Sequence, residues 1–189
     1  MSNKIKIIQA SFPCSGSTIL CNVLYGFFCP LMPIVFRPAD SVPLIFPEDS
    51  QNSRFIYKSH IYKDTSLGLK LLDSDKHNIF LIMSERDKKY PKELRNHTKV
   101  LIFPFEDLAA RDSYYPDSPH SLEWVISNIY EKLTEFLPPQ LFCNESEMIE
   151  SALKRVTSMN KVCEDIKDKP FSYFDKFYHV HGSHRGKKR

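Results

Sequence analysis

The chain has 189 residues, of which 42% are hydrophobic and 26% charged, and its formal net charge at pH 7 is +3. This composition is ordinary for a soluble globular protein, and the length predicts a single domain over residues 1–189. Four cations lie in the last five residues, so the rest of the chain is close to neutral and is not expected to bind nucleic acid: Arg185, Lys187, Lys188 and Arg189.

The cysteines and the N-terminal sequence predict the cellular location. An odd number of cysteines without a C-x-x-C pair predicts reduced thiols and no zinc site. The chain begins with a strand-like segment and a polar turn, which is not a signal-peptide pattern, so we expect a cytoplasmic protein. Asn22, Pro30 and Pro33 interrupt the apolar stretch that follows, so no membrane span is expected. The cysteines are Cys14, Cys21, Cys29, Cys143 and Cys163.

The first half of the chain predicts two strands and two helices around one long connection. Ile5–Gln9 is an apolar strand, and after a Pro/Ser/Gly turn the apolar residues of Ser17–Phe28 predict a helix. The proline-rich stretch Pro30–Ser53 is expected to be irregular. Phe55–Lys58 predicts the next strand, and Ser66–Leu72 predicts a short helix.

The second half continues this alternation. Ile79–Met83 is apolar at every position, which is typical of a parallel strand buried on both faces, and Val100–Phe103 predicts another strand. Ser118–Leu137 and Asn144–Ile166 have the three-to-four-residue apolar spacing of helices, and Tyr178–Val180 is a weak strand candidate. The pattern predicts an α/β fold, a three-layer αβα arrangement with a central, mainly parallel sheet.

The turn before the first predicted helix has the composition of a phosphate-binding loop, Pro13-Cys14-Ser15-Gly16-Ser17-Thr18. Gly16 would let the backbone approach an anion, and the helix N-terminus would supply N–H donors. The nucleotide-triphosphate P-loop requires Lys after the glycine, where this chain has Ser17, so a kinase or ATPase of that type is disfavoured. A plain strand-to-helix turn with a serine N-cap is the alternative.

Two predicted strands end in basic residues. Lys58-Ser59-His60 places a cation and an imidazole at the sheet edge where ligands of open α/β sheets bind, and His60 is suited to act as a general base. Arg86 follows Ile79–Met83 and is suited to a phosphate. The alternatives are that Lys58 is a solvated surface charge, that His60 caps a turn, and that Arg86 pairs with a nearby carboxylate.

The C-terminal segment combines histidines with basic residues and glycines. Its histidines have no accompanying acidic or cysteine cluster, so no metal site is expected. A basic segment that folds over a phosphate and a disordered tail are both compatible with this composition.

In this order, the motifs resemble those of the sulfotransferase family, whose donor is 3′-phosphoadenosine-5′-phosphosulfate (PAPS). The family has a P-K-S-G-T-T-W-like loop, similar to residues 13–19, and then a strand ending in K-T-H, similar to Lys58-Ser59-His60. Arg86 matches the arginine after its next apolar strand. Val100–Leu108 resembles a strand ending in Y-E-D-L, and Phe174–Arg189 resembles the family's basic, glycine-containing C-terminal segment.

The resemblance implies a P-loop-like fold that moves a sulfuryl group from PAPS to the hydroxyl of a small-molecule or carbohydrate acceptor, with adenosine 3′,5′-bisphosphate (PAP) as product. It implies that His60 is the general base and that Lys58 stabilises the transferring group. Because a sulfuryl group is monoanionic, no metal is expected. The residues implied to hold the donor are Pro13, Cys14, Ser15, Gly16, Ser17 and Thr18 for the phosphosulfate, and Arg86, Arg185, Gly186 and Lys187 for the 3′-phosphate.

The chain departs from the family pattern at two positions. Cys14 replaces the loop lysine, which contacts the donor where leaving-group charge develops, and Leu94 stands eight residues after Arg86, where the family has a serine. Three alternatives therefore stay open: a protein that binds the donor nucleotide without catalysis, an unusual small P-loop kinase, and a scaffold without nucleotide affinity.

Overall fold

The computed structural model describes residues 5–11, 15–29, 34–36, 55–59, 65–73, 78–87, 89–113 and 115–182. Most of Pro30–Ser53 and several predicted site residues lie outside these ranges: Pro13, Cys14, His60, Arg185, Gly186 and Lys187.

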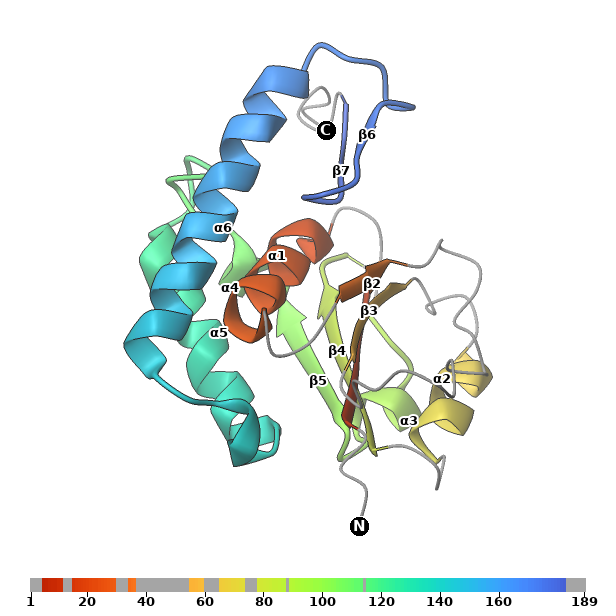
Figure 1. Cartoon of the computed structure of the whole chain (residues 1–189). Coiled ribbons are helices and arrows are strands. Elements are labelled where there is room, and N and C mark those ends of the chain that lie inside the picture. Colours follow the sequence, from red (N-terminus) through yellow and green to blue (C-terminus); the bar gives the residue numbers. More distant parts are fainter. Residues whose placement is uncertain are drawn as a thin grey trace.

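A five-stranded sheet in the order β2-β3-β1-β4-β5 forms the centre of the fold (Figure 1). Every neighbouring pair of strands in it is parallel, which confirms the predicted α/β class with a mainly parallel sheet. The strands are β1 (Ile5–Ser11), β2 (Ile34–Phe36), β3 (Phe55–Ser59), β4 (Asn78–Glu85) and β5 (Val100–Pro104).

The fifth strand of the sheet is not the predicted one. β2 lies inside the stretch expected to be irregular and pairs with the outer edge of β3. The candidate Tyr178–Val180 does not join this sheet, because β7 (Val180–His181) pairs antiparallel with β6 (Phe174–Asp175) in a separate hairpin. A three-residue strand is too short to show a period, and it forms because the edge of β3 offers backbone groups to pair with.

Helices pack against both faces of the sheet (Figure 1). On one face, α1 lies between the sheet and α6. The helices of this face are α1 (Ser17–Phe28), α4 (Phe105–Leu108), α5 (Leu122–Phe136) and α6 (Glu145–Ile166), with the 3₁₀ turn η1 (Pro139–Leu141) between α5 and α6. Those of the other face are α2 (Thr65–Leu72) and α3 (Lys92–Arg95).

The two long helices begin at residues whose side chains cap them. α5 begins at Leu122 and not at Ser118 as predicted, because the side chain of Ser121 accepts a hydrogen bond from Trp124 N at 3.2 Å. Asn144 caps α6, since its Oδ1 accepts a hydrogen bond from Glu147 N at 3.4 Å. Ser118 instead donates to the carbonyl of Ala109, within the connection before α5.

The buried side chains alternate between the two faces along each strand. Ile5 and Ile7 of β1 join the core under α1, α5 and α6, whereas Ile8 and Ala10 join the core under α2 and α3. α1 and α6 approach so closely that a Cβ on Gly26 would lie 2.4 Å from Ala152 Cα. These contacts hold α1 firmly on the sheet, with its N-terminus at the carboxyl end of β1.

Candidate functional site

The direction of strand order reverses at β1, since β3 and β2 lie on one side of it and β4 and β5 on the other. In open α/β sheets, ligands bind outside the carboxyl ends of the strands at such a point. The predicted loop connects β1 to α1 at this place, and Lys58 of β3 and Arg86 after β4 flank it. The geometry therefore brings these sequence-predicted groups to one edge of the sheet.

The N-terminus of α1 is built on Gly16. Gly16 is the N-cap residue and has a left-handed backbone, with φ of 83°, so the predicted alternative of a serine N-cap is wrong. A Cβ at this position would also lie 2.9 Å from Leu108 Cδ1. Because glycine has no side chain with which to cap the helix, the first-turn N–H groups are available to an anion. Ser17 and Thr18 are half-buried in this first turn.

Beneath this turn, hydroxyl groups cross-link β1, β4 and the loop. Ser84 Oγ donates to Ser11 Oγ at 2.8 Å, and Ser15 Oγ lies 3.0 Å from Ser84 Oγ. Gln9 Nε2 donates to Ser11 Oγ at 2.7 Å. All four residues are buried, so this network fixes Ser15 to the carboxyl ends of β1 and β4. Gln9 Oε1 accepts no hydrogen bond from the described part of the chain, although it is buried.

Lys58 is a buried cation beside this cluster. Its side chain is on the α1 face of the sheet, opposite Gln9 in register, and the residue is 5% exposed, so the interpretation as a solvated charge is wrong. Burial lowers the pKa of its ammonium, which the neighbouring Cys21 partly offsets. No carboxylate among the residues that the structure describes pairs with it. A buried ammonium without a counter-ion is costly, and a bound anion would relieve that cost.

Arg86 lies on the other side of the loop. Its guanidinium carbon is 4.3 Å from the centre of the Phe105 ring, and its side chain is 47% exposed. Nε is 4.0 Å from Asp87 Oδ1, which is a loose contact between exposed groups. Arg86 lines a cavity of about 400 Å³ together with the perpendicular rings of Phe105 and Tyr115 and with His120. This volume is at the lower end of small-molecule pockets, about 300–1,000 Å³.

Glu85, the residue before Arg86, is structural. Burial alone would raise the pKa of its carboxyl, but hydrogen bonds from Arg95 and Lys89 outweigh burial and lower it. Lys89 Nζ lies 3.2 Å from Glu85 Oε1, and Arg95 pairs with the other carboxylate oxygen. Leu94 is buried on the face of α2 and α3, so it supplies no ligand in place of the family serine.

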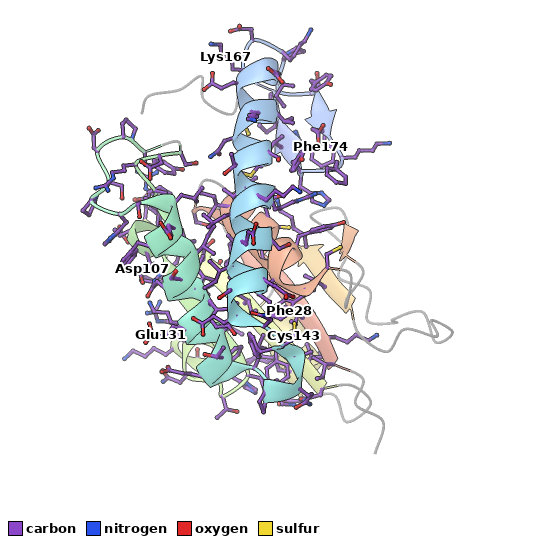
Figure 2. The ribbon with its side chains drawn as sticks, turned by 60° about the vertical axis from the view of Figure 1, so that its left-hand side comes forward. Phe28, Asp107, Glu131, Cys143, Lys167 and Phe174 are labelled. Carbon is purple, nitrogen blue, oxygen red and sulfur yellow. The ribbon has the colours of Figure 1, made fainter. Side chains whose placement is uncertain are left out.

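The β6–β7 hairpin contacts α1 and α6 beyond the end of the sheet to which the strand arrows point (Figure 1). Figure 2 shows its Phe174 beside the C-terminal part of α6. Asn22 Nδ2 donates to the Tyr178 carbonyl at 2.8 Å, and Arg155 donates to the Phe177 carbonyl. The predicted basic residues after Gly182 lie outside the described residues.

Within the described residues, no three His, Cys, Asp or Glu side chains form a group that could hold a metal ion. No helix in the same part of the chain is both long enough and apolar enough to cross a bilayer.

The chain matches neither a protein-family model nor a curated protein. The resemblance to sulfotransferases therefore rests on the motifs and their order along the chain.

The residue patterns did not point to several groups that the structure places at this edge. On the α1 face of the sheet, the apolar side chains of β1 and β4 give way to polar ones near the carboxyl end of each strand. The polar residues are Gln9 and Ser11 in β1 and Ser84 in β4. This change from apolar to polar on one strand face was a usable signal, because a buried polar group needs a partner. Arg155 and Asn22 had no such signal, since they lie within helices far from the loop in sequence.

Proposed function

We propose that the protein is a sulfotransferase that moves a sulfuryl group from PAPS to the hydroxyl of a small-molecule or carbohydrate acceptor. The observation that carries this proposal is the buried ammonium of Lys58, without a carboxylate in the described chain, beside the glycine-capped N-terminus of α1. In this proposal the two helical faces and the sheet are the three layers of an αβα fold, and the β1–α1 connection is its P-loop-like cradle.

The donor would bind along the carboxyl edge of the sheet. Backbone N–H groups of residues 15–18 hold the 5′-phosphosulfate, with Lys58 at its side. Arg86 holds the 3′-phosphate together with Arg185, Gly186 and Lys187, and the aromatic cavity beside Arg86 takes the nucleoside. Gly16 lies between the phosphosulfate part and the nucleoside part of this proposed site, because a Cβ there would lie 3.6 Å from the Phe105 ring that Arg86 covers.

The reaction is a displacement at sulfur. His60 removes the proton of the acceptor hydroxyl, the acceptor oxygen forms a bond to sulfur, and the bond from sulfur to the 5′-phosphate oxygen breaks, which releases PAP. The loose transition state spreads charge over the equatorial sulfuryl oxygens, as in phosphoryl transfer, so a fixed cation such as Lys58 contributes most there.

Binding of PAP is the first test. Calorimetric titration of the full chain is expected to give micromolar affinity for PAP and no comparable affinity for ATP–Mg²⁺. Lys58→Met should weaken PAP binding at least tenfold, on the scale of one charge-assisted contact, whereas Lys70→Met, a change of an exposed lysine on α2, should not. Lys58→Met removes a buried charge, so its melting temperature should not fall. No affinity for PAP would refute the proposal.

Turnover with labelled donor across hydroxyl acceptors is the second test. His60→Ala should abolish transfer and leave PAP affinity nearly unchanged, and wild-type kcat in this variant would show that another group is the base.

Cys14 supports a second candidate, a protein that binds the donor nucleotide without transferring its sulfuryl group. Tight PAP binding without transfer to any acceptor would favour it. In the catalytic case, Cys14→Lys should raise the transfer rate, since it restores a cation near the leaving group.

A further inference from the structure

The connection from α6 to β6 exposes aromatic rings at the outermost end of the molecule in Figure 1. In this connection, Phe171 is 62% exposed and Tyr173 is 45% exposed. The described ranges contain two other exposed large apolar side chains, Trp124 on α5 and Phe177 in the hairpin, so three of the four lie within seven consecutive residues. Exposed apolar side chains that gather in one place mark an interaction surface.

The two exposed rings of the connection are held by contacts with the end of β7. The Phe171 ring is stacked on that of His181, with 4.6 Å between the ring centres, and His181 Nδ1 lies 3.1 Å from the Phe171 carbonyl oxygen. Tyr173 N donates to the Pro170 carbonyl at 2.8 Å, and the Tyr173 carbonyl accepts from Gly182 N at 2.8 Å. A Cβ on Gly182 would collide with the Pro170 carbonyl oxygen. The chain after Gly182 therefore starts beside these rings.

Positive charge is concentrated in the same part of the chain. Residues 167–189 contain seven Lys and Arg against two Asp, a net charge of +5, whereas the whole chain carries +3, so residues 1–166 have a net charge of −2. Four of the seven cations follow Gly182 by three to seven positions. A fully extended chain spans at most about 3.6 Å per residue, which keeps these four within about 25 Å of Gly182. The other three are exposed on the structure: Lys167, Lys169 and Lys176.

Basic residues around exposed rings are typical of a surface that binds anionic lipid. Aromatic rings enter the boundary between headgroups and acyl chains, while Lys and Arg side chains stay at the level of the phosphates. Figure 2 shows Lys167 at the end of α6, where the connection starts. Lys167 pairs with Glu164 at 3.6 Å, but both side chains are about half exposed, so this weak pair leaves Lys167 accessible to a lipid phosphate.

The position of the rings and the charge of the remaining chain favour a lipid surface over a nucleic acid. Single-stranded nucleic acids bind along charged grooves, whereas this connection is the outermost end of the molecule (Figure 1). The net negative charge of residues 1–166 is repelled by an anionic surface that attracts residues 167–189. This asymmetry orients the molecule with the exposed rings toward the lipid.

We propose that residues 167–173 and the basic C-terminal residues dock the protein on an anionic lipid surface, with the Phe171 and Tyr173 rings inserted at the level of the headgroups. This docking does not depend on the proposed function. Lys188 and Arg189 have no part in the proposed donor site and are available to lipid phosphates. The association is peripheral and reversible, because two partly inserted rings bury little apolar area and salt screens the attraction of the cations.

Co-sedimentation of the full chain with vesicles tests the docking. The protein should bind vesicles of phosphatidylserine and phosphatidylcholine mixed one to three, should bind less as salt is added, and should not bind vesicles of phosphatidylcholine alone. Lys188→Ser combined with Arg189→Ser should weaken binding about tenfold or more. Lys92→Ser combined with Lys154→Ser removes two exposed lysines of α3 and α6 and should change it less than about twofold. No binding to the anionic vesicles, or equal binding to the neutral ones, would overturn the proposal.

Tryptophan fluorescence tests the insertion of the rings, because the chain has a single tryptophan, Trp124. Bromine on the lipid acyl chains quenches a tryptophan that it touches. Wild-type protein on brominated anionic vesicles should keep its fluorescence, since Trp124 lies on α5 outside the docking segment. Phe171→Trp combined with Trp124→Phe should be quenched, and Phe171→Ala should weaken vesicle binding about fivefold or more. A tryptophan at position 171 that stays unquenched on bound vesicles would refute the insertion.

The outcomes separate lipid docking from the other possibilities. Binding to a single-stranded oligonucleotide without binding to anionic vesicles would assign this surface to nucleic acid and overturn the proposal. Vesicle binding without PAP binding would keep the docking surface and refute the sulfotransferase, and the reverse would refute the docking surface alone. Because vesicle binding of the wild-type chain is itself decisive, a variant that fails to fold does not prevent the test.

Discussion

Two charged residues at the carboxyl edge of the sheet are buried almost equally and have opposite surroundings. Glu85 is 3% exposed and is paired with Lys89 and Arg95, whereas Lys58 is 5% exposed and has no carboxylate partner in the described chain. Protonation equilibria reflect this difference: pairing stabilises the charged Glu85, and burial destabilises the charged Lys58. The paired charge of Glu85 therefore contributes to stability, whereas the unpaired charge of Lys58 can be compensated by a bound anion.

Glu85→Gln is expected to lower stability in a pH-dependent way. The pKa of Glu85 in the folded chain is below its ordinary value of 4.5, so its stabilisation is present above that value and is lost as the pH falls through the folded pKa. At pH 7 the substitution should cost about 2 kcal/mol, on the scale of a charge-assisted hydrogen bond. Urea unfolding at pH 7, 5 and 3.5 measures the difference, which should shrink toward the lowest pH.

Glu93→Gln is the control for Glu85, because Glu93 is exposed on α3. It should change the free energy of unfolding by less than about 0.5 kcal/mol. A cost of Glu85→Gln that stays constant over this pH range would show that the ion pairs do not provide the stabilisation.

At the scale of elements, α1 connects the site to the rest of the molecule. Its N-terminus carries the glycine cap, its middle holds Asn22 against Arg155 and the hairpin, and Gly26 packs against Ala152 of α6. The close approach of α1 and α6 therefore sets the position of the hairpin relative to the loop. A substitution at the contact between α1 and α6 should therefore shift the hairpin although it alters no residue of the candidate site.

Gly26→Ala tests the helix contact, because two effects of opposite sign compete. The higher helix propensity of alanine would stabilise α1 by about 1 kcal/mol. Its Cβ, however, would lie 2.4 Å from Ala152 Cα, and such overpacking costs about 1–3 kcal/mol. Since backbone cannot give way as a flexible side chain does, we expect net destabilisation in urea unfolding. Ser151→Ala on the exposed side of α6 should have almost no effect, and a Gly26→Ala protein more stable than wild type would contradict the close packing.

At the scale of the whole molecule, the candidate site combines parts that are far apart along the chain. The N-terminus of α1, the end of β3 and Arg86 after β4 lie at one edge of the sheet because parallel strands bring their carboxyl ends together. The hairpin contacts α1 from the other end of the sequence through Asn22, whose amide bonds the Tyr178 carbonyl. The hairpin ends at Gly182, whose neighbours are Lys169, Pro170 and Tyr173 after the C-terminus of α6.

If the proposed function is right, removal of residues 184–189 should weaken PAP binding about tenfold, because the contacts proposed for Arg185 and Lys187 with the 3′-phosphate would be lost. Calorimetric titration of the shortened chain measures this change. Replacement of Lys188 and Arg189 by serine is the control, since it removes charge from the same segment but no predicted contact, and it should preserve the affinity. Unchanged affinity after the deletion would show that the segment takes no part in the site.

Local patterns in the sequence were sufficient for the elements with clear periods. The continuous apolar run of β4 predicted a buried parallel strand, and the spacing in α1 and α6 predicted helices at nearly their observed bounds. Short elements were not predictable in this way. β2 has three residues, and β7 joins a hairpin of two-residue strands, so the pairing partner and not the local sequence determines that each is a strand.

The sequence by itself determined the α/β class, the glycine turn before α1 and the presence of basic residues at two strand ends, because these depend on neighbouring residues. Only the tertiary structure decided that Lys58 is buried without a carboxylate partner in the described chain. It also decided that the Ser15 hydroxyl hydrogen-bonds to that of Ser84, and that Arg155 holds the β6–β7 hairpin through the Phe177 carbonyl. Burial and charge compensation depend on which distant segments meet, and that is a property of the packed sheet and helices.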